Sequence, residues 1–156
     1  MIDITHIHPM LVHFPIVFFI SATVIFLVLT LKSEDLAARE CLQLTGTAAL
    51  AIGLLIACLA AFFGDIALDA AVAKGFAAPP LERHEEMAMV TLAVFSLLTG
   101  VAMVAIWKKI PLAHRRAWCF LAVAVIGIVL LLVTAYLGGE LVYGIGVNVD
   151  SVIPIK

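Results

Sequence analysis

The chain has 156 residues, of which 65% are hydrophobic and only 13% are charged. Soluble domains average roughly half apolar residues and a quarter charged residues, so this composition excludes an ordinary soluble domain and indicates a protein embedded in a lipid bilayer. The formal net charge of −2 gives no reason to expect a nucleic-acid partner.

Four apolar segments are each long enough to cross a membrane: 10–31, 42–64, 87–107 and 118–137. About 20 residues of α-helix span a hydrocarbon core of about 30 Å, and a helix satisfies its own backbone hydrogen bonds there. The sequence therefore predicts an all-α fold, a four-helix transmembrane bundle formed as one domain by residues 1–156. Its helices are expected at about 9–32, 41–64, 82–108 and 116–138.

Two segments outside these helices are expected at one face of the bundle. The first half of the connection 65–81 has the pattern of a short amphipathic helix that ends at Gly75. The tail 139–156 is rich in glycine and in apolar residues, so we expect an irregular cap or a short strand. The first and second helix pairs show no detectable sequence repeat.

The distribution of basic residues predicts the orientation. The short segments 32–40 and 108–117 lie on the same side of the bundle and hold most of the basic residues: Lys32, Arg39, Lys108, Lys109, Arg115 and Arg116. Cytoplasmic loops are enriched in Lys and Arg. We therefore expect this side to be cytoplasmic, and both termini to lie on the outer, periplasmic side of a bacterial inner membrane.

Histidines gather at the outer end of this bundle. His8 and His13 lie near the start of the first helix, and His84 opens the third. A b-type heme needs two imidazoles from different helices at similar depth with an apolar slot between them. We expect His13 and His84 to be the axial ligands and Arg83 to pair with a heme propionate; the alternative is that both histidines only tune helix packing.

His8 and His13 cannot both point into one site in a regular helix, because five residues rotate by about 500°, or 140° net; an unwound start around Pro9 would relax this limit. Pro15 is expected to kink the helix nearby. From this geometry, His13 is assigned as the inward ligand, and His8 as a supporting residue or an alternative ligand.

Carboxylates at the same level allow a second hypothesis. His8, His13 and His84, together with Asp65, Glu85 or Glu140, could bind Zn²⁺ or Cu²⁺. No tight ligand spacing is present, and the glutamates near the start of the third helix also suit the helix dipole. A third hypothesis is a structural or assembly subunit without a prosthetic group.

Several segments together resemble a known family. They are the stretch from His8-Pro9 to His13-Phe14-Pro15, the pair Gly64-Asp65, the helix-opening His84, and the segment 137–147 that begins Leu-Gly-Gly-Glu-Leu-Val-Tyr. This pattern is similar to that of the bacterial membrane family called domain of unknown function 2231. One departure is that a histidine often found in the family near position 144 or 145 is replaced here by Gly144 and Ile145.

The resemblance implies a four-helix membrane protein of unassigned activity, in a family whose domain is sometimes joined to cytochrome c modules. Electron transfer is therefore the expected function, with a cytochrome c or a quinone as redox partner. If the protein is an enzyme, it is expected to be a redox component. Whether it forms a homo-oligomer is left open.

Overall fold

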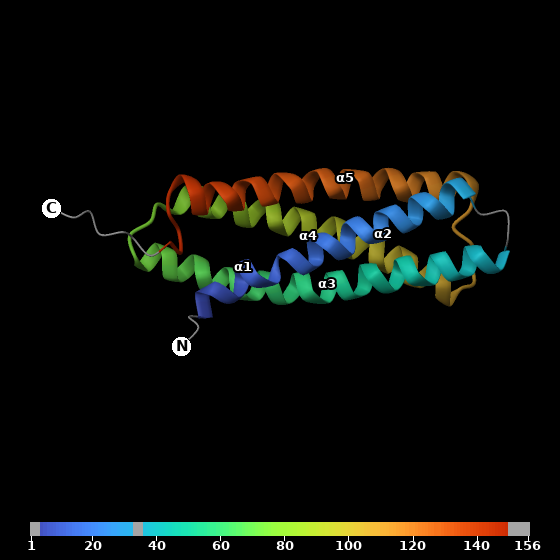
Figure 1. Cartoon of the computed structure of the whole chain (residues 1–156), viewed down its shortest axis with the longest axis horizontal. Helices are drawn as coiled ribbons and strands as arrows, with labels where there is room; N and C mark the ends of the chain where they lie inside the picture. The colour runs from blue at the N-terminus through green and yellow to red at the C-terminus, as the bar shows by residue number, and fades with distance from the viewer. Residues whose placement is uncertain (1–3, 33–35, 150–156) are drawn as a thin grey trace.

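The computed structural model describes residues 4–32 and 36–149, and this part of the chain consists of helices joined by short turns, without a strand. The elements are η1 (Ile4–His6), α1 (Ile7–Leu11), α2 (His13–Lys32), α3 (Leu36–Ala73), α4 (Ala78–Trp107), α5 (His114–Gly139) and the π-helical turn η2 (Glu140–Gly144) (Figure 1). Four helical stretches are long and apolar enough to cross a membrane. The predicted four-helix membrane fold is confirmed.

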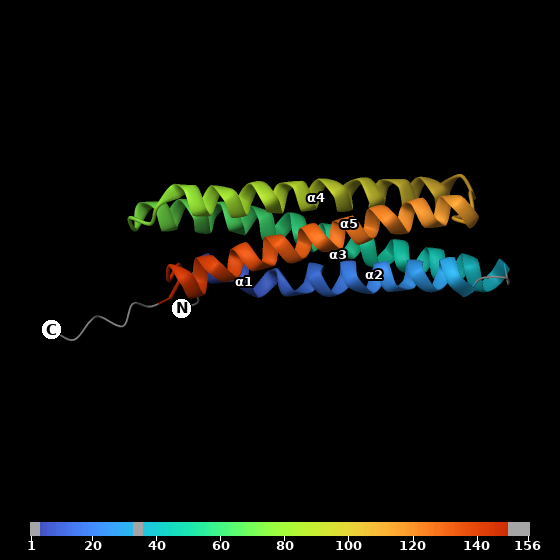
Figure 2. The same ribbon diagram turned by 90° about the horizontal axis from the view of Figure 1, so that it is seen from above.

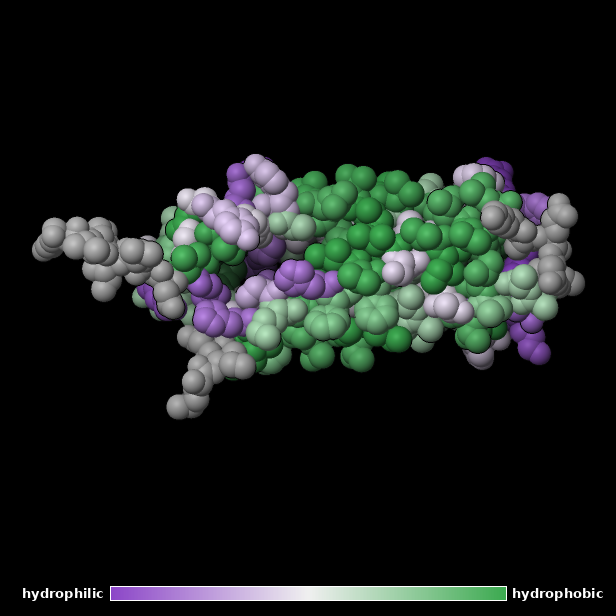
Figure 3. Space-filling model, in the orientation of Figure 1, coloured by the Kyte–Doolittle hydropathy of each residue, from purple (hydrophilic) through white to green (hydrophobic). Residues whose placement is uncertain are grey.

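The long helices run side by side along the length of the molecule (Figures 1 and 2). Each packs against the next in chain order, and α5 closes the ring against α2. Hydrophobic residues cover the middle of the surface, and hydrophilic residues gather toward its two ends (Figure 3). This band is the surface that the lipid bilayer contacts, since its apolar side chains have no other cover in the described chain.

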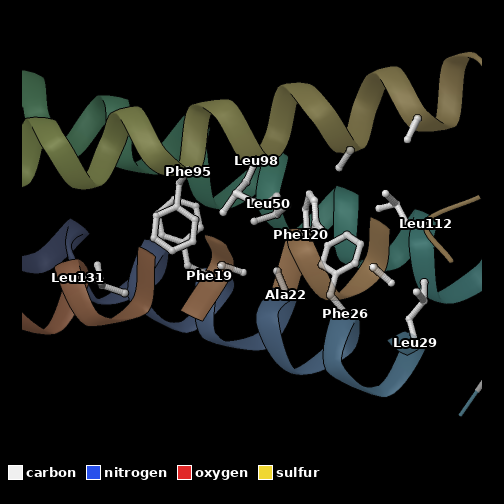
Figure 4. Close-up of a cluster of buried hydrophobic side chains, with 14 residues drawn as sticks. Phe19, Ala22, Phe26, Leu29, Leu50, Phe95, Leu98, Leu112, Phe120 and Leu131 are labelled. Atoms are coloured by element: carbon white, nitrogen blue, oxygen red, sulfur yellow. The ribbon is translucent and has the colours of Figure 1, made fainter. Parts of the chain in front are cut away.

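Buried side chains recur every three or four positions along each helix, as in the seams of a coiled coil. On α2 these are Phe19, Ala22, Phe26 and Leu29, and on α4 they are Phe95, Leu98, Ala102 and Ala105. At the centre of the bundle the rings of Phe19 and Phe95 stack, with centroids 3.8 Å apart and an interplanar angle of 2° (Figure 4). Helices α2 and α4 therefore meet across the ring at this point.

Helix α2 is separated from α1 by Val12. Pro15 has no N–H to donate to the carbonyl of Leu11, so the α-helical ladder is interrupted in the turn before it. The break lies where the sequence predicts a kink. At the same end of the molecule, the Asn148 side chain donates a hydrogen bond of 3.1 Å to the carbonyl of Thr5. The first and last parts of the described chain are thus joined there.

Two helices extend further than predicted. Helix α3 does not end at Gly64 but continues through Asp65 to Ala73, so the predicted short helix is its last part. Helix α4 begins at Ala78, with prolines in its first turn, where a missing N–H costs little. The connection between α3 and α4 is consequently short. The tail continues from α5 as η2 and then as irregular turns over residues 145–149, where Val147 packs with Ala71 and Leu81 as an irregular cap rather than a strand. Residues 150–156 lie outside the described part.

The opposite end, which carries the basic loops, is held by buried Gln43. Its amide nitrogen donates to the carbonyl of Ile110 at 3.3 Å, and its amide oxygen accepts from the Leu112 N–H at 3.2 Å. Arg39 donates to the carbonyl of Leu112 at 3.1 Å. These contacts satisfy backbone groups of the α4–α5 connection that would otherwise be costly to bury.

Candidate site between two paired histidines

His8 and His84 face one another inside the end of the bundle opposite the basic loops. Their ring centroids lie 6.2 Å apart and their planes are nearly perpendicular, at 85°. His8 comes from α1 and His84 from α4, so the pair spans the ring in the same way as the stacked phenylalanines. Figure 3 shows a hollow in this part of the surface, with hydrophilic residues in it. We call His8 and His84 the histidine pair.

Each imidazole is fixed by a backbone carbonyl of the helix that follows its own transmembrane helix. His8 Nδ1 lies 2.7 Å from the oxygen of Ala60, and His84 Nδ1 lies 3.1 Å from the oxygen of Thr134. Because a carbonyl can only accept, each Nδ1 must carry the hydrogen. In a neutral imidazole the lone pair is then on Nε2. Within residues 4–32 and 36–149, neither Nε2 atom has a hydrogen-bond partner.

Each imidazole also lies against a glycine, one turn after its carbonyl partner. A Cβ built on Gly64 would be 2.9 Å from Nδ1 of His8, and a Cβ on Gly138 would be 3.1 Å from Cε1 of His84. Any larger residue would push the ring away from the helix backbone. This contact explains the physical role of glycine in the Gly64-Asp65 pair and in the Gly-Gly-Glu segment.

The site belongs to an internal structural repeat. Phe19 follows His8 by eleven positions, and Phe95 follows His84 by eleven. In each half, a glycine eleven positions before the histidine-contacting glycine meets that phenylalanine: Gly53 with Phe19, and Gly127 with Phe95. We call α1, α2 and α3 the first hairpin, and α4 and α5 the second hairpin. The two hairpins are thus similar in structure, contrary to the expectation of no repeat.

His13 does not face His84. Its side chain is exposed on the outside of the helix, whereas His8 is the inward residue. The rotation argument separates the two histidines correctly but assigns the wrong one to the interior. The spacing of the core identifies the right one, because the seam through Phe26, Ala22, Phe19 and Pro15 reaches His8 when continued at intervals of three and four.

The predicted carboxylate ligands are not brought to the histidine pair. Asp65, Glu85 and Glu140 are exposed, and Glu140 accepts a hydrogen bond of 2.9 Å from the hydroxyl of Tyr136. In the described part of the chain, no three His, Cys, Asp or Glu side chains form a group that could hold a metal ion. The six-residue set expected for Zn²⁺ or Cu²⁺ therefore does not converge.

Arg83 lies beside His84 in sequence, and its exposed side chain lines a cavity of about 480 Å³ between the start of α4 and the end of α5. The cavity is bounded by Pro79 and Pro80 on one side and by Leu137, Glu140 and Leu141 on the other. It is therefore a second feature at the same end of the bundle, and neither histidine of the pair lines it.

Sequence reasoning missed the residues that hold the histidines in place. These are the carbonyls of Ala60 and Thr134 and the two contacting glycines, Gly64 and Gly138. Backbone carbonyls leave no mark in the sequence. The glycines do leave a signal, since both fall on the same seam as the buried residues of α3 and α5.

The fold and the histidine pair define a class: a four-helix membrane protein with two imidazoles held between its helices near one end. The chain belongs to the family described as "Predicted membrane protein (DUF2231)", which matches residues 5–151. The resemblance seen in the sequence is confirmed over nearly the whole chain. No curated protein and no solved structure matches the chain.

Proposed function

We propose that the protein binds a b-type heme, with His8 and His84 rather than His13 as axial ligands, and that it transfers electrons. The observation that carries this proposal is the 6.2 Å separation of the two imidazole centroids. Metal–imidazole bonds are about 2 Å long, and a ring centroid lies about 1 Å behind its nitrogen, so two opposed imidazoles on one metal ion have centroids about 6 Å apart.

The surroundings of the histidine pair support the same assignment. A metal-bound imidazole usually donates its other N–H to a carbonyl or a carboxylate, which fixes its tautomer and its orientation. The carbonyls of Ala60 and Thr134 provide such partners and leave both Nε2 atoms for a metal. Gly64 and Gly138 let each ring lie close to a helix backbone, which leaves more room between the rings.

Each part of the chain has a separate task in this proposal. The two imidazoles would hold the iron, and the heme would supply a reversible one-electron couple whose potential depends on its ligands and on burial. Arg83 offers a guanidinium next to His84 in sequence, suited to a charge-assisted pair with a propionate.

The orientation is part of the proposal. The enrichment of Lys and Arg in cytoplasmic loops supports a cytoplasmic location for the basic loops. The histidine pair then lies near the outer face of a bacterial inner membrane, where a periplasmic cytochrome c could exchange electrons with it. A reporter fused to the C-terminus tests this arrangement: we expect periplasmic activity, and cytoplasmic activity would contradict it.

An absorption spectrum of protein purified from cells supplied with heme tests the central proposal. We expect a Soret band and, because both axial positions are filled, no spectral change when carbon monoxide is added to the reduced protein. Absence of a Soret band would contradict heme binding. A band that shifts fully with carbon monoxide would contradict ligation by two histidines.

A copper ion is the second candidate, because the histidine pair offers two imidazole nitrogens and soft or borderline metals accept such ligands. Zinc fits less well, since its sites use three or four protein ligands and the described residues hold no group of three. Elemental analysis separates these outcomes. Iron in the purified protein would support heme, and copper would support the alternative. Absence of both metals would support a structural or assembly role.

A further inference from the structure

We propose that the cavity between the start of α4 and the end of α5 binds the headgroup of a quinone or quinol that reaches it from the membrane. The cavity has a volume of about 480 Å³, within the range of about 300–1,000 Å³ found for small-molecule sites. The heme proposal uses the neighbouring histidine pair and, among the residues that line the cavity, only Arg83.

The wall of the cavity is formed in part by η2, which is a π-helical turn. Such turns are rare and frequently lie at functional sites, since they widen a helix and change the direction of its side chains. Here the turn brings Glu140 and Leu141 to the cavity, opposite Pro79 and Pro80 of α4. The backbone is thus shaped at the same place where the cavity lies.

The polar groups of the cavity suit a neutral ligand with both acceptor and donor atoms. Arg83 and Glu140 both line it. A guanidinium can only donate hydrogen bonds, and an ionised carboxylate can only accept them. A quinone carbonyl would accept from Arg83, and a quinol hydroxyl would donate to Glu140. The carboxylate disfavours the alternative of an anionic lipid phosphate through like-charge repulsion.

The remaining lining is apolar and comes largely from proline and leucine side chains: Pro79, Pro80, Leu137 and Leu141. Prolines offer rigid, flat apolar walls against which a ring can pack at little entropic cost. The cavity lies at the polar end of α4 and α5, next to the apolar parts of these two helices, which are long and apolar enough to cross a membrane. A headgroup carried on an isoprenoid tail would reach it from the lipid.

Binding of the headgroup does not depend on the heme proposal, but electron transfer to or from the quinone rests on that proposal. Arg83 precedes His84, and Leu137 precedes Gly138, which contacts the His84 ring. A quinone in the cavity would therefore touch residues that are next in sequence to His84 and to the glycine that contacts it. This position gives the proposed redox centre a membrane-soluble partner.

The test measures photo-crosslinking of an azido-ubiquinone to the full chain in nanodiscs, with the site located by mass spectrometry. We expect saturable labelling within 137–145 or at the start of α4, reduced at least about tenfold by Gly144→Leu, since Gly144 lines the cavity and has open space at its Cβ position. The matched control is Gly100→Leu, also with open space but away from the cavity. Arg83→Gln and Glu140→Gln should each weaken labelling.

Labelling that is spread over the lipid-facing surface, or that Gly144→Leu and Gly100→Leu reduce equally, would overturn the proposal. So would full competition by added phosphatidylethanolamine, which would assign the cavity to a lipid headgroup. The doubly substituted His8→Ala, His84→Ala protein separates the two proposals, because it should lose the Soret band and keep the quinone labelling. If the unsubstituted protein shows no Soret band but is labelled by the azido-ubiquinone, only the heme proposal is contradicted.

Discussion

The two hairpins position their histidines in the same way but differ in the residues around them. Both place a histidine against a glycine and a carbonyl of the next helix, and both continue to a phenylalanine at the centre. The second hairpin adds a hydrogen bond between Thr91 and Thr134. The corresponding positions of the first hairpin are Pro15 and Ala60, so its helix is broken there and no such bond forms.

This difference shows which features the site depends on. Both hairpins contain the histidine, the carbonyl that it meets and the glycine that it contacts, so these three features position the imidazoles. The threonine pair and the proline break occur in one hairpin each and adjust local packing. Substitutions at matched positions should therefore have similar effects where both hairpins hold the same feature, and unequal effects where only one hairpin holds it.

The largest effect on folding is expected from the stacked phenylalanines. Phe19→Ala and Phe95→Ala should each lower the free energy of unfolding by about 3–5 kcal/mol, as for other fully buried aromatic residues, because both rings are at most 1% exposed. Unfolding of the purified protein in detergent measures this. Phe62→Ala, at a ring that is 62% exposed, is the control. Effects of Phe19→Ala and Phe95→Ala that differ by more than about 2 kcal/mol would break the comparison.

The contacting glycines should affect the site more than the fold. Gly64→Ala should weaken heme binding by about 10–100-fold, the range for loss of an outer-shell partner, because its Cβ would lie 2.9 Å from the His8 ring. Gly138→Ala should have a smaller effect, since its closest contact is 3.1 Å. Titration of heme-free protein, followed by Soret absorbance, measures both.

Neighbouring Gly139 provides a matched control for this prediction. A Cβ there meets nothing within 4 Å, so Gly139→Ala should leave heme affinity unchanged and should stabilise the helix slightly. Equal weakening by Gly138→Ala and Gly139→Ala would mean that helix flexibility, rather than contact with His84, explains the effect.

The smallest effect is expected from the threonine pair of the second hairpin. Thr134→Val removes the hydroxyl that meets Thr91 but keeps the carbonyl that meets His84. We expect a loss of about 0.6 kcal/mol in the free energy of unfolding, typical of hydrogen bonds between membrane helices, with unchanged heme affinity. Thr30→Val is the control, because the Thr30 hydroxyl donates to the Phe26 carbonyl of its own helix. A large loss of heme would show that the hydroxyl pair positions His84.

Composition and segment length were enough to predict the fold. Four long apolar stretches can satisfy their backbone only as helices, and they do so here. Helix ends were harder to predict, because Gly64 and Asp65 read as a terminus in sequence but lie inside α3. Gly64 contacts the His8 imidazole. The glycine at this position therefore reflects a contact between helices rather than the end of a helix.

The repeat could not be read from residue identities because matched positions exchange large and small side chains. Phe26 of the first hairpin packs over Gly46, whereas the corresponding residues of the second are Ala102 and Phe120. The rings of Phe26 and Phe120 then meet at 4.5 Å. Large and small side chains of the two hairpins together fill the centre of the bundle, although matched positions hold different residues.

Residues near the site were predicted in part. His84 was expected to point inward and does, but His8 takes the inward place expected for His13. The seam of buried residues gave the information needed to choose between them. The carbonyl partners could not have been predicted, since every residue has a carbonyl and only the packing of the helices selects two of them.

The most direct measurement of the central claim is the heme content of three single variants expressed side by side with heme supplied. His8→Ala and His84→Ala should each lose most of the Soret absorbance, or bind carbon monoxide at the vacated position, with recovery on addition of imidazole. His13→Ala should keep the spectrum of the unsubstituted protein, since its side chain is exposed. Loss of heme in His13→Ala together with retention in His8→Ala would contradict the account.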